Sequence, residues 1–340
     1  MSKLSPSLKG LINAPFARPG PTPAPRNIKA VYTKIADEAR ERKYGEKPWL
    51  ALSAAATFTL NSPSSLGPLL TVASSRWQQP SPSSSSNPNP NPPSDNPPSA
   101  LLLAPAEFIR EIGLKCISFN GIPRTINTLN AFRSHLSSAH PHLSPHLSTT
   151  PTRQTTPQNI SSVHARGRQL WESIYTPLDA KLEVKLSEAH PDLPVHILQS
   201  HYGPLLSDPT ERNGLGSVGR SLTSVVAIAC LRAQTGVGPQ VLSHVFGLRK
   251  AVEQGAHLHE FAVVVGQSGG QSGGEGSKGE KKNEEAEGIE RLASDEGCEW
   301  ILRSVDAISE AMAAAAAMAQ DGNMNEGGVA TPMRKRESKL

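Results

Sequence analysis

A carboxylic acid among apolar residues is the first group in this chain that could move protons. Glu111 lies within the largely apolar segment 106–117, where burial would raise the pKa of its carboxyl group and suit it to general acid–base chemistry. A salt bridge with Arg110, Lys115 or Arg124, or simple solvation, accounts for Glu111 equally well. Glu111 is therefore a candidate catalytic residue for which a structural role stays open.

A second candidate for proton transfer is His244, which lies in the largely apolar segment 241–246. A single histidine in such surroundings is more often a hydrogen-bonded core residue than a catalyst, and both interpretations stay open. Arg124 follows Gly121 at the start of a predicted helix. Its guanidinium group could bind a substrate carboxylate or simply face water.

The three cysteines, Cys116, Cys230 and Cys298, lie on or directly before different predicted helices, at positions typical of buried packing residues. They are too few and too scattered for a disulfide framework, which suits a reducing compartment. No Cys-x-x-Cys motif occurs. Because a thiol peroxidase needs a reactive thiolate and a second thiol close by, we expect no such activity.

Histidines are concentrated between residues 135 and 146, where they alternate with Pro and Ser. Such a segment offers no fixed geometry for metal ligands, so we expect no metal site and no cofactor.

Apolar residues at helical spacing predict an all-α fold, without a convincing run of alternating strand residues. The predicted helices cover residues 48–60, 66–77, 106–117, 123–136, 222–233, 238–252 and 300–318. Pro123 suits the first turn of its helix, where a missing N–H costs nothing.

The second half of the chain repeats the order of the first, with a low-complexity insertion before the last helix of each half. The corresponding segments are Gly67-Pro68 and Gly238-Pro239, Glu107-Phe108 and Glu260-Phe261, and 121–132 and 297–308. We therefore predict two tandem helical units.

Composition sets the expected boundaries of these units, because Pro, Gly, Ser and Asn tracts do not pack into a core. We predict a disordered N-terminus at 1–26, a first unit at 27–136 with a disordered insert at 80–99, a linker at 137–160, a second unit at 161–320 with a disordered insert at 266–288, and a flexible tail at 321–340.

The net charge of +4 does not predict nucleic-acid binding, because much of the basic excess lies in the two predicted disordered ends. Aromatic residues make up only 4% of the chain, and no basic stripe interleaved with them appears. No apolar run is long enough to span a bilayer, and no secretory signal is evident. We expect a soluble protein that binds neither nucleic acid nor membrane.

The last three residues, Ser338-Lys339-Leu340, match an address that the peroxisomal import receptor reads. The basic segment 333–336 precedes them. We therefore expect a location in the peroxisomal matrix and the import receptor as a partner. The minor alternative is a mitochondrial location, since the first 36 residues contain Arg and Ser and no acid, although prolines interrupt any amphipathic helix there.

Segment 107–111, followed by segment 119–130, resembles the signature of the carboxymuconolactone decarboxylase family within the AhpD-like superfamily. The resemblance implies an all-α fold whose units pair or close into rings, so that a tandem chain would form a covalent pseudo-dimer and a homo-oligomer. With the terminal address, the chain is similar to fungal peroxisomal matrix proteins of this type. Further similar segments in the second half are Gly167-Arg168, Trp171, Tyr175, 191–193, Tyr202-Gly203, 242–244 and Gly255-Ala256.

The departures from the family pattern are as informative as the matches. The positions at which the family's thiol peroxidases carry two cysteines and a histidine hold Pro123, Ile126 and Asn130. Each half keeps only one residue of an acid–base pair, Glu111 in the first and His244 in the second.

Two functions follow as hypotheses. In the first, Glu111 and His244 form a composite acid–base pair and Arg124 anchors the carboxylate of a small oxidised acid, lactone or acyl metabolite, without a cofactor. In the second, the protein is a non-catalytic oligomer that keeps the fold and binds metabolites or partners. If Glu111 and His244 line different places in the fold, the acid–base scheme fails.

Overall fold

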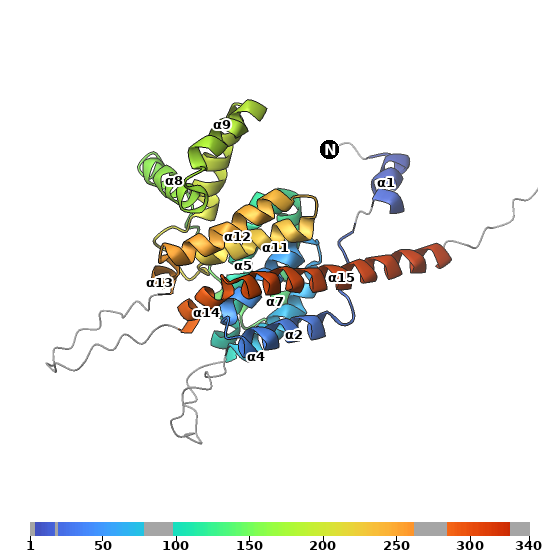
Figure 1. Ribbon diagram of the computed structural model, residues 1–340. Coiled ribbons are helices and arrows are strands. Elements are labelled where there is room, and N and C mark those ends of the chain that lie inside the picture. Colours follow the sequence, from blue (N-terminus) through green and yellow to red (C-terminus); the bar gives the residue numbers. More distant parts are fainter. Residues whose placement is uncertain (1–3, 18–19, 78–97, 262–283, 327–340) are drawn as a thin grey trace, which may run out of the picture.

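The computed structural model describes residues 4–17, 20–77, 98–261 and 284–326 and contains helices and no strand in these ranges (Figure 1). No helix in the described part is long and apolar enough to cross a membrane. The elements are α1 (Pro6–Ile12), η1 (Pro15–Ala17), α2 (Ile28–Glu41), α3 (Glu46–Thr59), η2 (Pro63–Ser65), α4 (Leu66–Arg76), α5 (Pro98–Lys115), α6 (Ile117–Asn120), α7 (Ile122–Ala139), η3 (Ser144–His146), α8 (Ile160–Tyr175), α9 (Asp179–Ala189), α10 (Asp192–His196), the π-helix η4 (Ile197–Leu206), α11 (Arg220–Gln234), α12 (Gly238–Glu253), α13 (Ala256–Glu260), α14 (Glu284–Leu292) and α15 (Asp295–Glu326).

Two helices, α3 and α11, pack against each other at the centre of the main core. Nearly every residue of both helices is buried, which explains their apolar, Ala-rich sequences. Small side chains let the backbones approach closely, so that the Cys230 sulfur of α11 lies 3.9 Å from the carbonyl oxygen of Ala55 in α3. Helices α2, α5 and α15 pack against α3, and α12 and α15 pack against α11.

Both central helices begin with a glycine N-cap that lies against a half-buried glutamate. Glu260 of α13 accepts hydrogen bonds from the N–H groups of Ser221 (2.7 Å) and Leu222 (3.2 Å) at the start of α11. Glu285 of α14 accepts one from Glu46 (3.1 Å) at the start of α3. A carboxylate is favoured at a helix N-terminus, where N–H groups lack partners within the helix.

Burial is the largest influence on both glutamates and raises the pKa of Glu260 and of Glu285 above the usual value. The N-cap glycines leave room for them, because a Cβ atom at Gly45 would lie 2.6 Å from an oxygen of Glu285, and one at Gly219 would collide with Glu260. The two halves of the chain therefore start their central helices in the same way.

A smaller hydrophobic cluster joins α8 and η4 beside the main core, around Trp171, Ile174, Tyr202 and Leu206. Helices α8 and α9 project from the rest of the molecule in Figure 1, and α8 packs on α12.

The predicted all-α fold is confirmed, and each of the seven predicted helices is present, at α3, α4, α5, α7, α11, α12 and α15. Pro123 lies in the first turn of α7, after Gly121 with a positive φ of 79°. Helix α2 was not predicted, although Ile28, Tyr32 and Ile35 give it a buried face at helical spacing.

Several segments expected to lack structure contain helices. The N-terminal segment holds α1, which has no buried residue. The expected linker 137–160 includes the end of α7 and buries Leu143 and Leu147 against the core. Residues 284–288 of the expected second insert begin α14, in which Ala286 is buried and Gly288 lies close to the backbone of Tyr44. The expected insert at 80–99 and the expected tail at 321–340 are wrong in part, because residues 98–99 begin α5 and residues 321–326 continue α15. Residues 80–97, 266–283 and 327–340 of the expected disordered segments lie outside the described residues.

Candidate functional site

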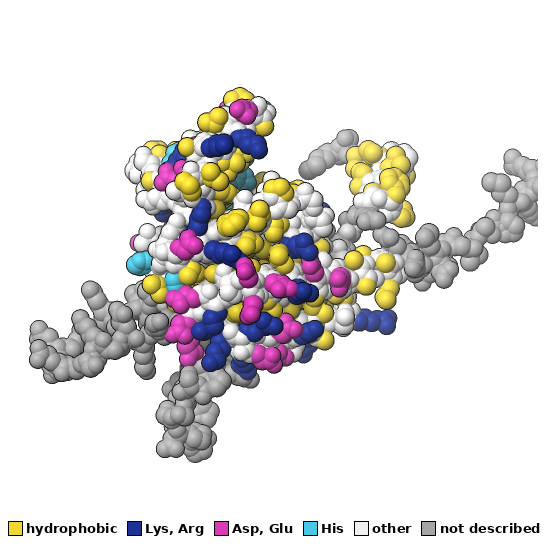
Figure 2. Space-filling view, viewed as in Figure 1, with side chains coloured by type: hydrophobic (Ala, Val, Ile, Leu, Met, Phe, Trp, Pro, Cys, Tyr) yellow, Lys and Arg dark blue, Asp and Glu magenta, His cyan; other side chains and the backbone are white. Residues whose placement is uncertain are grey.

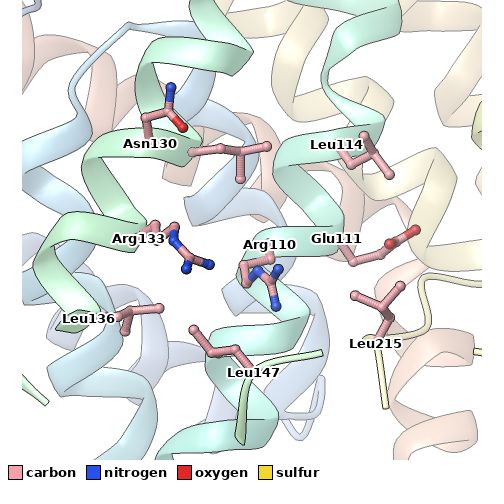
Figure 3. A pocket seen from close by; sticks show the side chains of 9 residues that line it. Arg110, Glu111, Leu114, Asn130, Arg133, Leu136, Leu147 and Leu215 are labelled. Atoms are coloured by element: carbon pink, nitrogen blue, oxygen red, sulfur yellow. The ribbon is translucent and has the colours of Figure 1, made fainter. Parts of the chain in front are cut away.

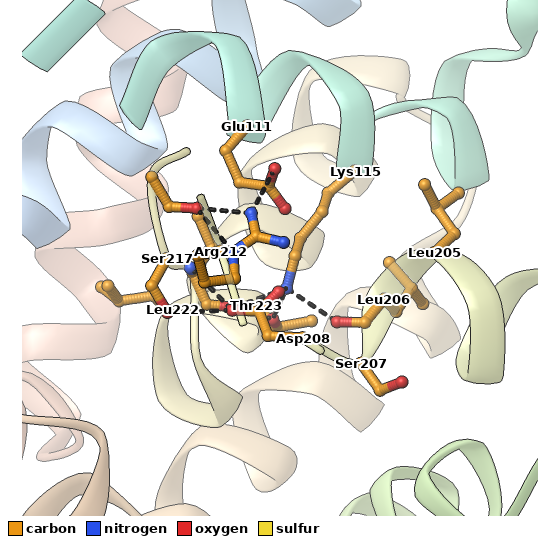
Figure 4. A network of polar contacts seen from close by, with 12 residues as sticks. Glu111, Lys115, Leu205, Leu206, Ser207, Asp208, Arg212, Ser217, Leu222 and Thr223 are labelled. Atoms are coloured by element: carbon orange, nitrogen blue, oxygen red, sulfur yellow. Dashed lines mark hydrogen bonds and ion pairs between the residues drawn. The ribbon is translucent and has the colours of Figure 1, made fainter. Parts of the chain in front are cut away.

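A buried ion cluster surrounds Glu111 on α5 (Figure 4). The Glu111 side chain is only 1% exposed. Arg153 reaches it with Nη2 2.5 Å from Oε1 and Nη1 3.3 Å from Oε2. Arg212 places Nη2 2.6 Å from Oε2. Guanidinium groups thus engage both carboxylate oxygens, the geometry in which a buried carboxylate is stabilised.

Lys115, one turn further along α5, supplies the third cation of the cluster and is fully buried. Its ammonium group donates to the carbonyl oxygens of Leu206 (2.7 Å) and Val218 and to the hydroxyl of Thr223 (3.1 Å). It also lies 2.9 Å from a carboxylate oxygen of Asp208. The charge is buried at tolerable cost because it is paired and hydrogen-bonded.

Asp208 connects Lys115 to the arginines. One of its oxygens lies 3.0 Å from Arg153, and the other accepts hydrogen bonds from Val218 N (2.9 Å) and Ser217 Oγ (3.1 Å). Burial acts to raise the pKa of Asp208, but the attraction of Lys115, Arg212 and Arg153 outweighs it, so the pKa lies below the usual value.

The ion cluster, defined as Glu111, Lys115, Arg153, Asp208 and Arg212, ties three separate parts of the chain together. It joins the last turns of α5 to the segment before α8 and to the loop that leads into α11. The structural alternative for Glu111 therefore has direct support, with partners more distant in sequence than the ones that the sequence suggested.

A cavity of about 280 Å³ lies beside the ion cluster, between α5 and α7 (Figure 3). Arg110 of α5 and Arg133 of α7 approach each other across it. Arg110 is paired with Glu107 at 2.7 Å, whereas exposed Arg133 has no carboxylate partner among the described residues. The rest of the lining is mainly leucine, and the full set is Arg110, Glu111, Leu114, Leu129, Asn130, Arg133, Leu136, Leu147 and Leu215.

His244 lies in a different environment, an aromatic cluster formed with Phe119, Trp171, Tyr175 and Tyr202. Its ring makes edge-to-face contacts with Phe119 (6.3 Å between centroids) and Tyr175 (6.2 Å). Trp171 packs on both tyrosines. His244 is only 6% exposed, and its Nδ1 has no hydrogen-bond partner within the protein.

Burial lowers the pKa of His244 to about 4, and the positive charge of Arg220 contributes in the same direction. Arg220 itself is held by hydrogen bonds to Ser173, Ser224 and the carbonyl oxygen of Gly247. His244 is therefore neutral near pH 7, with an electropositive neighbour that opposes its protonation.

The structure does not bring the expected acid–base pair together. Glu111 lines the cavity beside the ion cluster, and His244 does not belong to that lining. Arg124 is not in the lining either. It is exposed and donates to the carbonyl oxygen of Thr59 (2.9 Å), the last residue of α3, where it caps the helix end. The three residues thus serve three separate places in the fold.

Sequence reasoning missed Lys115 as a site residue, and it missed Arg153, Asp208 and Arg212 altogether. Their segments showed no helical periodicity, so no local pattern marked them. The only available signal was that Lys115 ends an apolar helix, a position where a buried lysine needs partners from elsewhere in the chain.

The cysteines are buried, as predicted, and all three are free thiols. Nothing in their sequence spacing predicts that the sulfurs of Cys116 and Cys230 lie 3.5 Å apart.

The histidine-rich segment is more ordered than expected, since the ring of His140 contacts the rings of both His135 and His142. No group of three or more His, Cys, Asp or Glu suited to a metal ion occurs in the described part of the chain.

Searches of protein-family models, of curated proteins and of solved structures found no match to this chain.

Proposed function

We propose that this protein binds small organic anions that carry an apolar body, in the cavity between α5 and α7, and that it is not an acid–base enzyme. The observation that carries the proposal is the lining, in which Arg110 and Arg133 face each other over leucine side chains. A guanidinium pair over an apolar wall suits a carboxylate with a short hydrocarbon tail.

The size of the cavity limits the ligand. Its volume of about 280 Å³ lies just below the range of roughly 300–1,000 Å³ that holds drug-sized ligands, so a short-chain carboxylate fits better than a long one. Arg110 is already paired with Glu107, which leaves Arg133 as the stronger anchor for a bound carboxylate.

The acid–base alternative has less support. Both oxygens of Glu111 are occupied by guanidinium groups, and His244 belongs to a different cluster. A general acid or base needs an oxygen or nitrogen within hydrogen-bond reach of the substrate, and the cavity offers Glu111 in an already paired state.

Calorimetric titration with hexanoate tests the proposal, with hexanol as the neutral probe of the same length. We expect hexanoate to bind and hexanol to bind at least tenfold more weakly. Arg133→Leu should weaken hexanoate binding about tenfold or more, since a charge-assisted hydrogen bond is worth about 1.5–3 kcal/mol. Arg303→Leu on α15, another exposed arginine, is the matched control and should change nothing. Equal binding of hexanoate and hexanol would refute the proposal.

The proposal includes a peroxisomal matrix location, reached through the import receptor. Its support is the sequence Ser338-Lys339-Leu340, which lies outside the described residues. The receptor needs a free terminal carboxylate, so a fluorescent fusion on the N-terminus should become cytosolic when Leu340 is deleted. Persistent puncta after that deletion would reject this part of the proposal.

We also propose that the two halves of the chain form a tandem pseudo-dimer and that the protein is a homo-oligomer. Both follow from the resemblance of the sequence to the carboxymuconolactone decarboxylase family. A tandem origin is supported by the glycine N-cap that α3 and α11 share. Hydrophobic side chains gather over α12 in Figure 2, where Leu242 and Phe246 are each more than half exposed. Light scattering on wild-type protein and on Phe246→Glu tests whether this face joins two copies: a dimer that becomes monomeric supports it, and a monomeric wild type rejects it.

A further inference from the structure

Two thiols that belong to different halves of the chain meet inside the core. Cys116 lies at the junction between α5 and α6, and Cys230 lies about one turn before the end of α11. Their sulfur atoms are 3.5 Å apart, and neither side chain is exposed. The third cysteine, Cys298, lies at the start of α15, where its sulfur contacts the carbonyl oxygens of Leu292 and Ala293 instead.

The separation of the two sulfurs is short enough for a covalent bond to form with little rearrangement. A disulfide requires about 2.05 Å between sulfurs, so the pair needs to close by about 1.5 Å. Cys116 is well placed for such a movement, because it stands between two helices rather than within one. Its backbone N–H still bonds to Ile112, which holds it at the end of α5.

We propose that Cys116 and Cys230 form an intramolecular disulfide when the protein meets hydrogen peroxide, and that this bond locks the end of α5 to the central helix α11. The site does not depend on the cavity or on its ligand.

The chemistry balances with peroxide as the oxidant. One thiol loses its proton, and the thiolate attacks a peroxide oxygen. The O–O bond breaks, and a sulfenic acid and water form. The second sulfur then attacks the sulfenic sulfur and expels a second water. Two thiols and one peroxide thus give one disulfide and two waters, and the two electrons lost by sulfur reduce the peroxide.

Burial makes this reaction slow rather than catalytic. Burial raises the pKa of the Cys116 thiol well above its usual value, and the neighbouring Cys230 adds to the effect. The reactive thiolate is therefore scarce, and peroxide reaches the pair only when the α5–α6 junction opens locally. A site with these properties responds to sustained oxidation and does not turn over peroxide like a thiol peroxidase.

The cross-link would stabilise the fold around the ion cluster. It joins positions 114 residues apart, and a disulfide that closes a long loop restricts the unfolded chain strongly. Cys116 directly follows Lys115, so the same bond would fix the buried lysine against Asp208.

The test uses the full-length protein, purified in reductant and then exposed to hydrogen peroxide. Thiols are counted in denaturant with an aromatic disulfide reagent, and peptides are mapped without reduction. We expect three thiols before oxidation and one afterwards, with a peptide pair that links Cys116 to Cys230. Cys298→Ser is the matched control and should go from two thiols to none.

Thermal unfolding separates a bond formed in the native fold from one formed by misfolding. The oxidised wild type should unfold at a higher temperature than the reduced protein, and added reductant should reverse the shift. Three thiols after peroxide treatment, a bond that involves Cys298, or an oxidised protein whose unfolding temperature does not rise would each overturn the proposal. Because these readouts use wild-type protein, they hold even where Cys116→Ser or Cys230→Ser fails to fold.

Discussion

The ion cluster around Glu111 and the aromatic cluster around His244 bury ionisable groups in opposite ways. In the ion cluster, two carboxylates pair with three cations, and each charged group has an oppositely charged partner within 3.0 Å. In the aromatic cluster, rings surround the imidazole and Arg220 is its charged neighbour, so the group stays neutral. The first cluster keeps its charges, and the second excludes charge.

This difference follows from what surrounds each group. A buried charge is tolerated where opposite charges and donors replace water. A buried histidine without an acidic partner is tolerated only in its neutral form. The ion cluster should therefore be sensitive to the loss of any partner, and the aromatic cluster should be sensitive to acid.

The largest expected effect is the loss of Lys115 from the ion cluster. Lys115→Met keeps the length of the side chain but removes the closest cation of Asp208. It also removes the lysine donor from the carbonyl oxygen of Leu206, whereas that of Val218 keeps the hydroxyl of Thr223. We expect the free energy of unfolding to fall by about 3–5 kcal/mol. Urea unfolding followed by circular dichroism measures it.

An exposed pair provides the control for that measurement. Arg303 and Glu299 lie four residues apart on the surface of α15, with both side chains more than half exposed. Arg303→Met should change the free energy of unfolding by less than about 0.5 kcal/mol. A loss below about 1 kcal/mol for Lys115→Met would show that the ion cluster contributes little to stability.

The next effect is the acid sensitivity of the aromatic cluster. The pKa of His244 is about 4 in the folded protein, whereas the ordinary value of 6.5 applies to the unfolded chain. The unfolded chain therefore binds the proton more readily. The contribution of His244 to stability is fully present above pH 6.5 and is lost as pH falls towards 4. The shift corresponds to about 3 kcal/mol at most, since each pKa unit is worth about 1.4 kcal/mol.

Comparison with His244→Phe isolates that contribution. Three glutamates have raised pKa values, so their protonation stabilises the folded protein as pH falls, opposite to the effect of His244: Glu107, Glu260 and Glu285. Their effect is the same in wild type and variant and cancels in the comparison. The difference in the free energy of unfolding between wild type and variant should therefore vary between pH 6.5 and 4 and be flat above pH 7. A difference that is constant over the whole range would contradict the lowered pKa of His244.

Glu111→Gln gives a smaller effect than the change at Lys115, because an amide oxygen still accepts a hydrogen bond from one arginine. The variant loses a charge-assisted contact with Arg153 or Arg212, so we expect a loss of about 1.5–3 kcal/mol at neutral pH. His244→Phe at the same pH should cost less than about 1 kcal/mol, since the wild-type imidazole is neutral. Equal losses for the two variants would remove the distinction between the clusters.

The helices could be predicted because their pattern is local. The Ala-rich sequences of α3 and α11 and the helical spacing of α7 are readable within one segment. Helix α14 was not predicted because contacts from distant parts of the chain stabilise its first residues, such as the hydrogen bond from Glu46 N to Glu285 and the close approach of Gly288 to Tyr44.

The site could not be predicted to the same extent, because its residues meet only in the fold. Glu111 was found from its apolar neighbours, but its partners Arg153 and Arg212 lie 42 and 101 positions further along the chain. The same limit hid the thiol pair. Helical periodicity shows that Cys116 and Cys230 are buried, but it does not show which buried residues touch.

The smallest expected loss of stability concerns α1, which belongs to neither cluster. Its removal is therefore the reference against which the losses from the two clusters are compared. It has no buried residue, and its apolar side chains, such as Leu8 and Leu11, are exposed. Among the described residues, Thr22 attaches this part of the chain to the core, because its N–H donates to the carbonyl oxygen of Asn61 (2.8 Å) and its hydroxyl to that of Leu60 (2.8 Å). A variant that lacks residues 1–17 keeps these bonds and should lose less than about 0.5 kcal/mol in urea unfolding, with the acid sensitivity due to His244 unchanged. A loss comparable to that of Glu111→Gln would mean that α1 packs on the core in solution, and the described structure would then understate what holds the two halves together.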